Sequence, residues 1–160
     1  MPGPQPGCGE PPMGSTDVVA TNLTGYFLVA RAFAAAFVEA RQGRFVNISM
    51  NHETMRRRGF VPYGPSRAGA ESLSLIITED LAPYGIAVNM LLPGGVTHTA
   101  MIPDGMTEAA RRSLLGPEVM GAPLVFLASP EVAGVTGEQI VAKDFDAWLA
   151  AFRSRPSAGG

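Results

Sequence analysis

Tyr63 and Arg67 stand four residues apart in a segment with the pattern of a helix start. An i, i+4 spacing places a phenol and a guanidinium on the same face of a helix. A phenol has an ordinary pKa of about 10 and needs a nearby cation to exchange protons near neutrality. These two side chains are therefore the first candidates for chemistry in this sequence.

Apolar segments on either side of this pair predict two buried strands. Residues 45–48 precede the pair, and residues 86–92 follow it and end abruptly at Pro93 and Gly94. Both segments are apolar on both faces, which is typical of parallel strands covered by helices. Because open α/β sheets bind ligands at the carboxyl ends of their strands, we expect Tyr63 to border such a site.

The other elements follow from apolar periodicity and turn residues. A long helix with a broad apolar face, expected to be buried, is predicted over residues 15–40, and a second helix from Tyr63 or Pro65 to about residue 82. A polar loop is expected over 51–59, further helices over 107–114, 117–128 and 145–152, and a third strand after a turn within 135–141. This order predicts an α/β fold: a partial doubly wound, Rossmann-like parallel sheet of about three strands with flanking helices.

Composition limits the classes of function. The 160 residues are 46% hydrophobic and 16% charged, which indicates one globular domain. A net charge of −2 argues against nucleic acid as a partner. Two histidines and one cysteine are too few for a metal site, so no metal is expected. The apolar stretch 26–38 is interrupted by Arg31 and is too short to cross a bilayer, so we expect no membrane partner and a cytoplasmic location.

Three regions are predicted along the chain. Residues 1–16 are rich in Pro and Gly and are expected to be a disordered N-terminal segment. Residues 17–153 form the folded domain. Residues 154–160 are expected to be a disordered tail.

From about residue 17 to residue 148 the chain resembles the C-terminal half of the short-chain dehydrogenase/reductase family. The segments that carry the resemblance occur in the family's order and spacing: Asn22, Val46-Asn-Ile-Ser49, Tyr63, Val88-Asn-Met-Leu-Leu-Pro-Gly94 and Gly134-Val-Thr-Gly137. The resemblance implies NAD or NADP as coenzyme and hydride transfer between its nicotinamide and a small-molecule carbonyl or alcohol substrate. It also implies a homodimer through the helices at 17–40 and 65–82.

The resemblance assigns a role to each matching residue. Tyr63 takes the acid/base position toward the substrate, and Arg67 takes the position of a lysine that assists it. Asn22 takes the position that keeps a water molecule for proton relay. Ser49 is the candidate for holding the substrate oxygen.

The resemblance also implies contacts with the coenzyme after the second strand. Pro93, Gly94 and Val96 are expected to line the nicotinamide site. Thr99, or alternatively Thr97, is expected to hydrogen-bond the carboxamide or a phosphate.

The sequence departs from the family pattern at three points. Arg67 replaces a lysine, and its planar guanidinium does not guarantee the lysine's contact with ribose. The family's serine position falls on Met50, and Ser49 points to the opposite face unless the strand end is bulged, which leaves His52 or Thr54 as alternatives. No strand followed by a glycine-rich phosphate loop precedes these motifs.

Two other functions remain open on these grounds. The chain could be a truncated or degenerate non-catalytic fragment that at most dimerises. It could also be a regulatory module that pairs the open edge of the strand at 45–48 with a partner.

Overall fold

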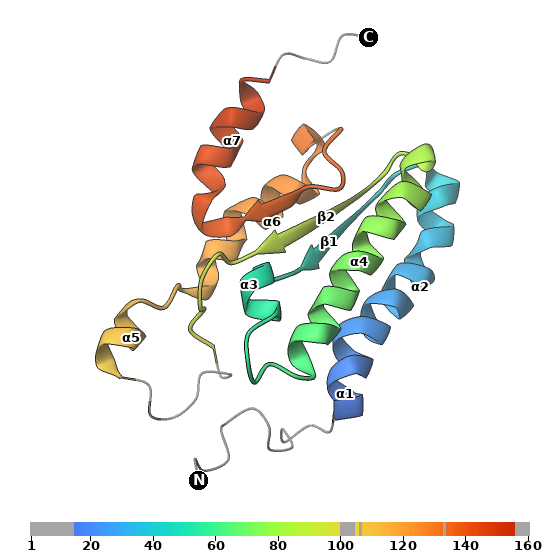
Figure 1. Cartoon of the computed structure of the whole chain (residues 1–160). Helices are drawn as coiled ribbons and strands as arrows, with labels where there is room; N and C mark the ends of the chain where they lie inside the picture. Colours follow the sequence, from blue (N-terminus) through green and yellow to red (C-terminus); the bar gives the residue numbers. More distant parts are fainter. Residues whose placement is uncertain (1–14, 100–104, 106, 133, 156–160) are drawn as a thin grey trace.

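A computed structural model describes residues 15–99, 105, 107–132 and 134–155. Its sheet has three parallel strands in the order β1 (Gly43–Ile48), β2 (Ile86–Leu92), β3 (Gln139–Val141) (Figure 1). The register pairs Phe45 with Val88 across the first two strands and Leu91 with Ile140 across the last two. The predicted α/β architecture with a three-stranded parallel sheet is confirmed.

Helices surround the sheet (Figure 1). The α-helices are α1 (Ser15–Val19), α2 (Gly25–Ala40), α3 (His52–Met55), α4 (Tyr63–Leu81), α5 (Glu108–Arg112), α6 (Gly121–Ala128) and α7 (Phe145–Arg153). A π-helical turn, η1 (Ala20–Thr24), joins α1 to α2. The 3-10 turns are η2 (Ala82–Tyr84), η3 (Pro117–Met120), η4 (Pro130–Val132) and η5 (Ala142–Asp144).

Two hydrophobic clusters hold the layers together. On one face of the sheet, Phe45 and Val88 pack with Leu81 of α4 and with partly buried side chains of α2. On the other face, a larger cluster joins Leu91 to α6 and α7. The two clusters separate because successive side chains of a strand point to opposite faces. The central strand β2 is buried along almost its whole length, as predicted, because helices cover both of its faces.

A buried amide fixes the third strand against the second. The Asn89 side chain donates to the Val135 carbonyl oxygen over 3.0 Å and accepts from the Glu138 amide over 3.1 Å. The Thr136 hydroxyl accepts from the Val88 amide over 3.1 Å. These bonds explain why a Val-Asn strand and a Gly-Val-Thr-Gly turn occur together: each satisfies the other's polar groups in the core.

Several predicted boundaries differ from the structure. The helix predicted over 15–40 is one helical run, but it contains a π turn that the apolar periodicity did not predict. Its start at Ser15 overlaps the segment 1–16 that was predicted to be disordered; residues 1–14 and 156–160 lie outside the described part. The polar loop 51–59 contains the unpredicted short helix α3.

Within the single chain, the broad apolar face of the first helix is not buried. No residue of α2 is buried, and Phe27, Val29 and Phe33 are 45%, 54% and 53% exposed. The reason is that α2 packs on α4 and on β1, which is an edge strand, so the rest of its surface has no neighbour among the described residues. The helical run Thr16–Ala40 extends beyond the apolar stretch 26–38 that was judged too short to cross a bilayer. By length and composition alone this run could cross a membrane, a test that core helices of soluble proteins also pass.

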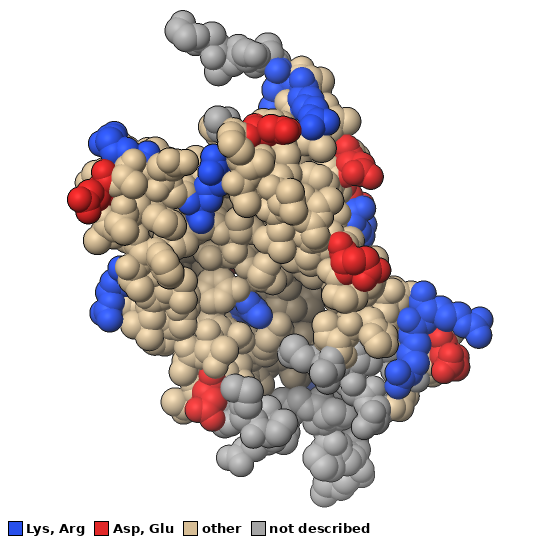
Figure 2. Space-filling view, turned by 180° about the vertical axis from the view of Figure 1, so that it is seen from behind, with Lys and Arg blue, Asp and Glu red and all other residues tan. Residues whose placement is uncertain are grey.

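Charged side chains are sparse on the face turned away from the viewer of Figure 1. Figure 2 shows that uncharged residues make up most of this face, and that basic and acidic side chains are scattered over it. On the face seen there, the lysines and arginines do not gather into one continuous patch of the kind that binds nucleic acid.

Candidate functional site

Helix α4 brings the predicted phenol and guanidinium together at the carboxyl end of β1. Tyr63 is the first residue of α4, and the guanidinium carbon of Arg67 lies 5.4 Å from the centre of its ring. The Nη1 atom of Arg67 donates to the carbonyl oxygen of Ile48, the last residue of β1, over 3.1 Å. The pair therefore lies at a strand end, which is where an open parallel sheet binds ligands.

The environment of Arg67 favours its charged form. Burial is the largest single influence and lowers the pKa, but the attraction of the Tyr63 and Tyr26 phenols and hydrogen bonding to them outweigh it, so the pKa of Arg67 is raised. Arg67 also lies over the ring of Tyr26, with its guanidinium carbon 5.8 Å from the ring centre. The site thus holds a permanent positive charge between two phenols.

Asn22 lies in the π-helical turn and contacts the start of α4. Its side-chain nitrogen donates to the Ser66 hydroxyl over 3.1 Å, and that hydroxyl donates to the Tyr63 carbonyl oxygen over 2.7 Å. This chain of bonds ties η1 to the first turn of α4. Single π turns inside helices often occur at functional sites, and this one contains Asn22.

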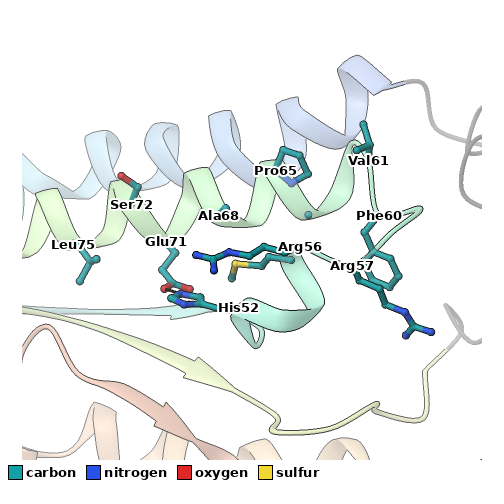
Figure 3. A pocket seen from close by; sticks show the side chains of 12 residues that line it. His52, Arg56, Arg57, Phe60, Val61, Pro65, Ala68, Glu71, Ser72 and Leu75 are labelled. Atoms are coloured by element: carbon teal, nitrogen blue, oxygen red, sulfur yellow. Dashed lines mark hydrogen bonds and ion pairs between the residues drawn. The ribbon is translucent and has the colours of Figure 1, made fainter.

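Ser49 is directed away from this arrangement. Its hydroxyl donates to Glu71 Oε2 over 2.9 Å, and Gln139 donates to the same oxygen over 3.2 Å. His52 pairs with the other oxygen of Glu71, as the facing side chains in Figure 3 show. Serine and imidazole both contact the carboxylate, so the imidazole does not activate Ser49 as the base of a hydrolase triad would.

A groove of about 610 Å³ lies between α3 and α4 (Figure 3). Its lining combines the cations Arg56 and Arg57 with apolar side chains such as Phe60 and Leu75. Tyr63 does not line it. The groove is therefore next to the site, and separate from its two phenols. Thr54, the other alternative to Ser49, belongs to α3 and is not among the lining residues.

The segment after β2 holds the residues predicted to contact a coenzyme. Pro93 accepts a hydrogen bond from the Lys143 amide over 3.2 Å, and Gly94 has a φ of +87°, which side-chain-bearing residues rarely adopt. Val96 is 57% exposed. The hydroxyl oxygen of Thr97 is buried and has no hydrogen-bond partner within the described residues, whereas Thr99 is exposed.

Sequence reasoning did not identify Tyr26, Ser66 and Glu71 as parts of the site. Helical spacing contained the signal for two of them. Tyr26 comes four residues after Asn22, and Glu71 comes four residues after Arg67. Within the described residues, no group of three His, Cys, Asp or Glu side chains is placed to hold a metal ion.

Comparison with known proteins finds relatives of similar sequence. The family model for short chain dehydrogenases matches residues 12–108. The 3-oxoacyl-[acyl-carrier-protein] reductase FabG of Vibrio cholerae is 30% identical over 134 residues, which cover 78% of this chain and 54% of that protein. The reductase of the same name from Pseudomonas aeruginosa is 32% identical over 133 residues, which cover 78% and 53%.

Solved structures match as well. A short chain dehydrogenase/reductase family protein superposes with a TM-score of 0.69 at 28% identity, over 79% of this chain and 55% of the other. The 3-oxoacyl-[acyl-carrier protein] reductase of Brucella melitensis superposes with a TM-score of 0.66 at 25% identity, over 81% and 53%. The chain thus spans about half the length of the relatives that it matches.

Proposed function

Because this chain belongs to the short-chain dehydrogenase family, we propose that it carries the proton-transfer site of an NAD(P)-dependent oxidoreductase that interconverts a carbonyl and an alcohol. The observation that carries the proposal is the position of Tyr63, with the Arg67 guanidinium carbon 5.4 Å from its ring centre at the end of β1. A phenol beside a fixed cation can give up and regain a proton at a ligand site.

In the direction of reduction, Tyr63 is the proton donor. A reduced nicotinamide held by the residues after β2 would supply the hydride for the carbonyl carbon. The Tyr63 hydroxyl gives its proton to the substrate oxygen, and Arg67 stabilises the negative charge left on the phenol oxygen. In the direction of oxidation, Tyr63 takes the proton back from the alcohol.

The residues after β2 suit the nicotinamide end of NAD or NADP. We assign Pro93, Gly94 and Val96 to the surface under the ring, and Thr99 or Thr97 to its polar substituent. The buried hydroxyl of Thr97, which has no hydrogen-bond partner within the described residues, supports this assignment because such a group is costly unless it is paired.

Asn22 and Ser49 receive different assignments. Asn22 stays the candidate for proton relay, because its bond to Ser66 holds it at the first turn of α4. Ser49 is a structural partner of Glu71. Met50 offers no hydroxyl in the position where the family resemblance places one, so we assign binding of the substrate oxygen to Tyr63.

We propose further that the chain forms a homodimer through residues 17–40 and 65–82. Exposed apolar side chains on both helices support this: Phe27, Val29 and Phe33 on α2, and Leu75 and Ile76 on α4. Hydrogen bonds join Asn22 and Tyr26 to α4. They favour a protein neighbour over a membrane for the helical run Thr16–Ala40. We also propose a cytoplasmic location, because one cysteine cannot form an internal disulfide and the composition gives no sign of an oxidising compartment.

The second candidate is a non-catalytic fragment that at most dimerises. Met50 in the place of a serine and the exposed face of α2 favour it. Calorimetric titration of the chain with NADH and with NADPH separates the two proposals. Binding of either coenzyme supports the enzyme, and the absence of heat for both at millimolar coenzyme supports the fragment.

Turnover tests the role of Tyr63. Acetoacetyl thioester is the test ketone, because the curated relatives are named 3-oxoacyl reductases. Tyr63→Phe is expected to lower the rate of coenzyme oxidation by about 100- to 10,000-fold. Tyr84→Phe, at the exposed end of η2, is the control and is expected to keep the wild-type rate. An unchanged rate in Tyr63→Phe would refute the assignment.

A further inference from the structure

Tyr26 closes a triangle of hydrogen bonds with Arg67 and the end of β1. Its hydroxyl donates to the Ile48 carbonyl oxygen over 2.8 Å and accepts from Arg67 Nη1 over 3.0 Å. Arg67 Nη1 donates to the same carbonyl over 3.1 Å. Three groups from α2, β1 and α4 therefore meet at one point.

The carbonyl in this triangle belongs to the free edge of the sheet. The amide of Ser49 donates to Leu91 of β2 over 2.9 Å. Because the backbone groups of successive strand residues point to opposite sides, the carbonyl of Ile48 points away from β2. Tyr26 and Arg67 satisfy this carbonyl, which otherwise would be an unpaired acceptor at an edge.

Arg67 needs such an anchor to keep its place. An arginine side chain has about 2 kcal/mol of rotamer entropy, and the guanidinium lies over the faces of two phenol rings. Tyr26 has a rigid ring with only two side-chain torsions, and it follows the π turn directly on the first turn of α2. The rigid phenol can therefore fix the flexible cation.

We propose that Tyr26 is a positioning residue that holds the Arg67 guanidinium over the ring of Tyr63. The value of this position for proton transfer rests on the proposed function. The placement itself does not, because it follows from the three hydrogen bonds. In this arrangement the position of the Arg67 guanidinium is fixed by contacts with α2 and β1 as well as by α4, the helix that carries it.

Nitrogen-15 NMR of the guanidinium groups in the full chain tests the placement. In the wild-type chain we expect separate, slowly exchanging Nη signals for Arg67, identified by their loss in Arg67→Lys. We also expect nuclear Overhauser contacts from these protons to the rings of Tyr26 and Tyr63. Absence of the contact to Tyr26 would overturn the proposal without any tyrosine variant.

Removal of one hydroxyl gives the matched comparison. In Tyr26→Phe the Nη protons of Arg67 are expected to exchange with water at least about tenfold faster, the equivalent of one hydrogen bond. Tyr84→Phe removes a hydroxyl from an exposed tyrosine and is expected to leave the exchange rate unchanged. Equal rates in the wild type and in Tyr26→Phe would overturn the proposal.

The two proposals fail separately. The NMR experiment needs neither coenzyme nor turnover, so an inactive chain with a fixed Arg67 contradicts the proposed function and supports the role of Tyr26. An active chain in which the Nη protons of Arg67 exchange freely supports the proposed function and contradicts the role of Tyr26.

Discussion

The side-chain amide nitrogen of Asn22 donates a hydrogen bond to the Ser66 hydroxyl oxygen over 3.1 Å, and this bond joins the π-helical turn to α4. Ser66 is 2% exposed, and its hydroxyl donates in turn to the Tyr63 carbonyl oxygen. The position of the Tyr63 backbone thus depends on a residue that lies more than forty residues earlier in the chain.

Ser66→Ala is expected to destabilise the fold. The change leaves the Asn22 amide without this acceptor in a half-buried place, which costs about 1–2 kcal/mol of unfolding free energy. Urea denaturation followed by circular dichroism measures it. Ser72→Ala, an exposed serine of the same helix, is the control and is expected to change stability by only a few tenths of a kcal/mol. Equal effects of the two substitutions would show that the bond does not contribute.

Gly94→Ala is expected to lower the free energy of unfolding by more than the same substitution does at another glycine with a positive φ. A Cβ at Gly94 would collide with the side chain of Val141 and lie 2.7 Å from Lys143 Cγ. Gly134 has nearly the same φ, +86° against +87°, and no atom within 4 Å of its Cβ position. We therefore expect Gly134→Ala to lose about 1–2 kcal/mol and Gly94→Ala about 1–3 kcal/mol more. Thermal unfolding of both variants checks the difference, and equal losses would exclude the steric term.

Met50→Ser is expected to raise activity. It places a hydroxyl at the position where the family resemblance puts one, and one added hydrogen bond to the substrate oxygen corresponds to about a tenfold gain in kcat/KM. Met50→Ala is the control, since it removes the same half-buried side chain without adding a hydroxyl. The measurement is reduction of acetoacetyl thioester with NADPH. The same kcat/KM in both variants would mean that the hydroxyl does not reach the substrate.

Ile76→Glu is expected to break the proposed dimer. Ile76 is 57% exposed on α4, and burying a charge against an apolar partner is costly unless the charge is paired. Val125→Glu, at a site 72% exposed on α6 against the opposite face of the sheet, is the control and is expected to leave association unchanged. Sedimentation velocity over a range of concentrations distinguishes the species. A wild-type chain that sediments as a monomer throughout would refute the interface.

Most of the fold could be predicted from local sequence signals. The start of α4 at Tyr63, the strand Ile86–Leu92 and the parallel order of the sheet follow from apolar periodicity and from prolines and glycines. These signals are local, because a strand or helix end depends on a few adjacent residues. The same spacing placed Tyr63 and Arg67 on one face of α4.

The tertiary structure alone decided which side chains meet. Ser49 donates a hydrogen bond to Glu71, 22 residues away in the sequence, and Arg67 donates one to Tyr26, 41 residues away. Such pairs depend on how α2, β1 and α4 pack, and no local pattern encodes that packing. The exposure of α2 has the same cause: its apolar sequence predicts burial, but burial requires a neighbour, and only the arrangement of the layers determines where neighbours lie.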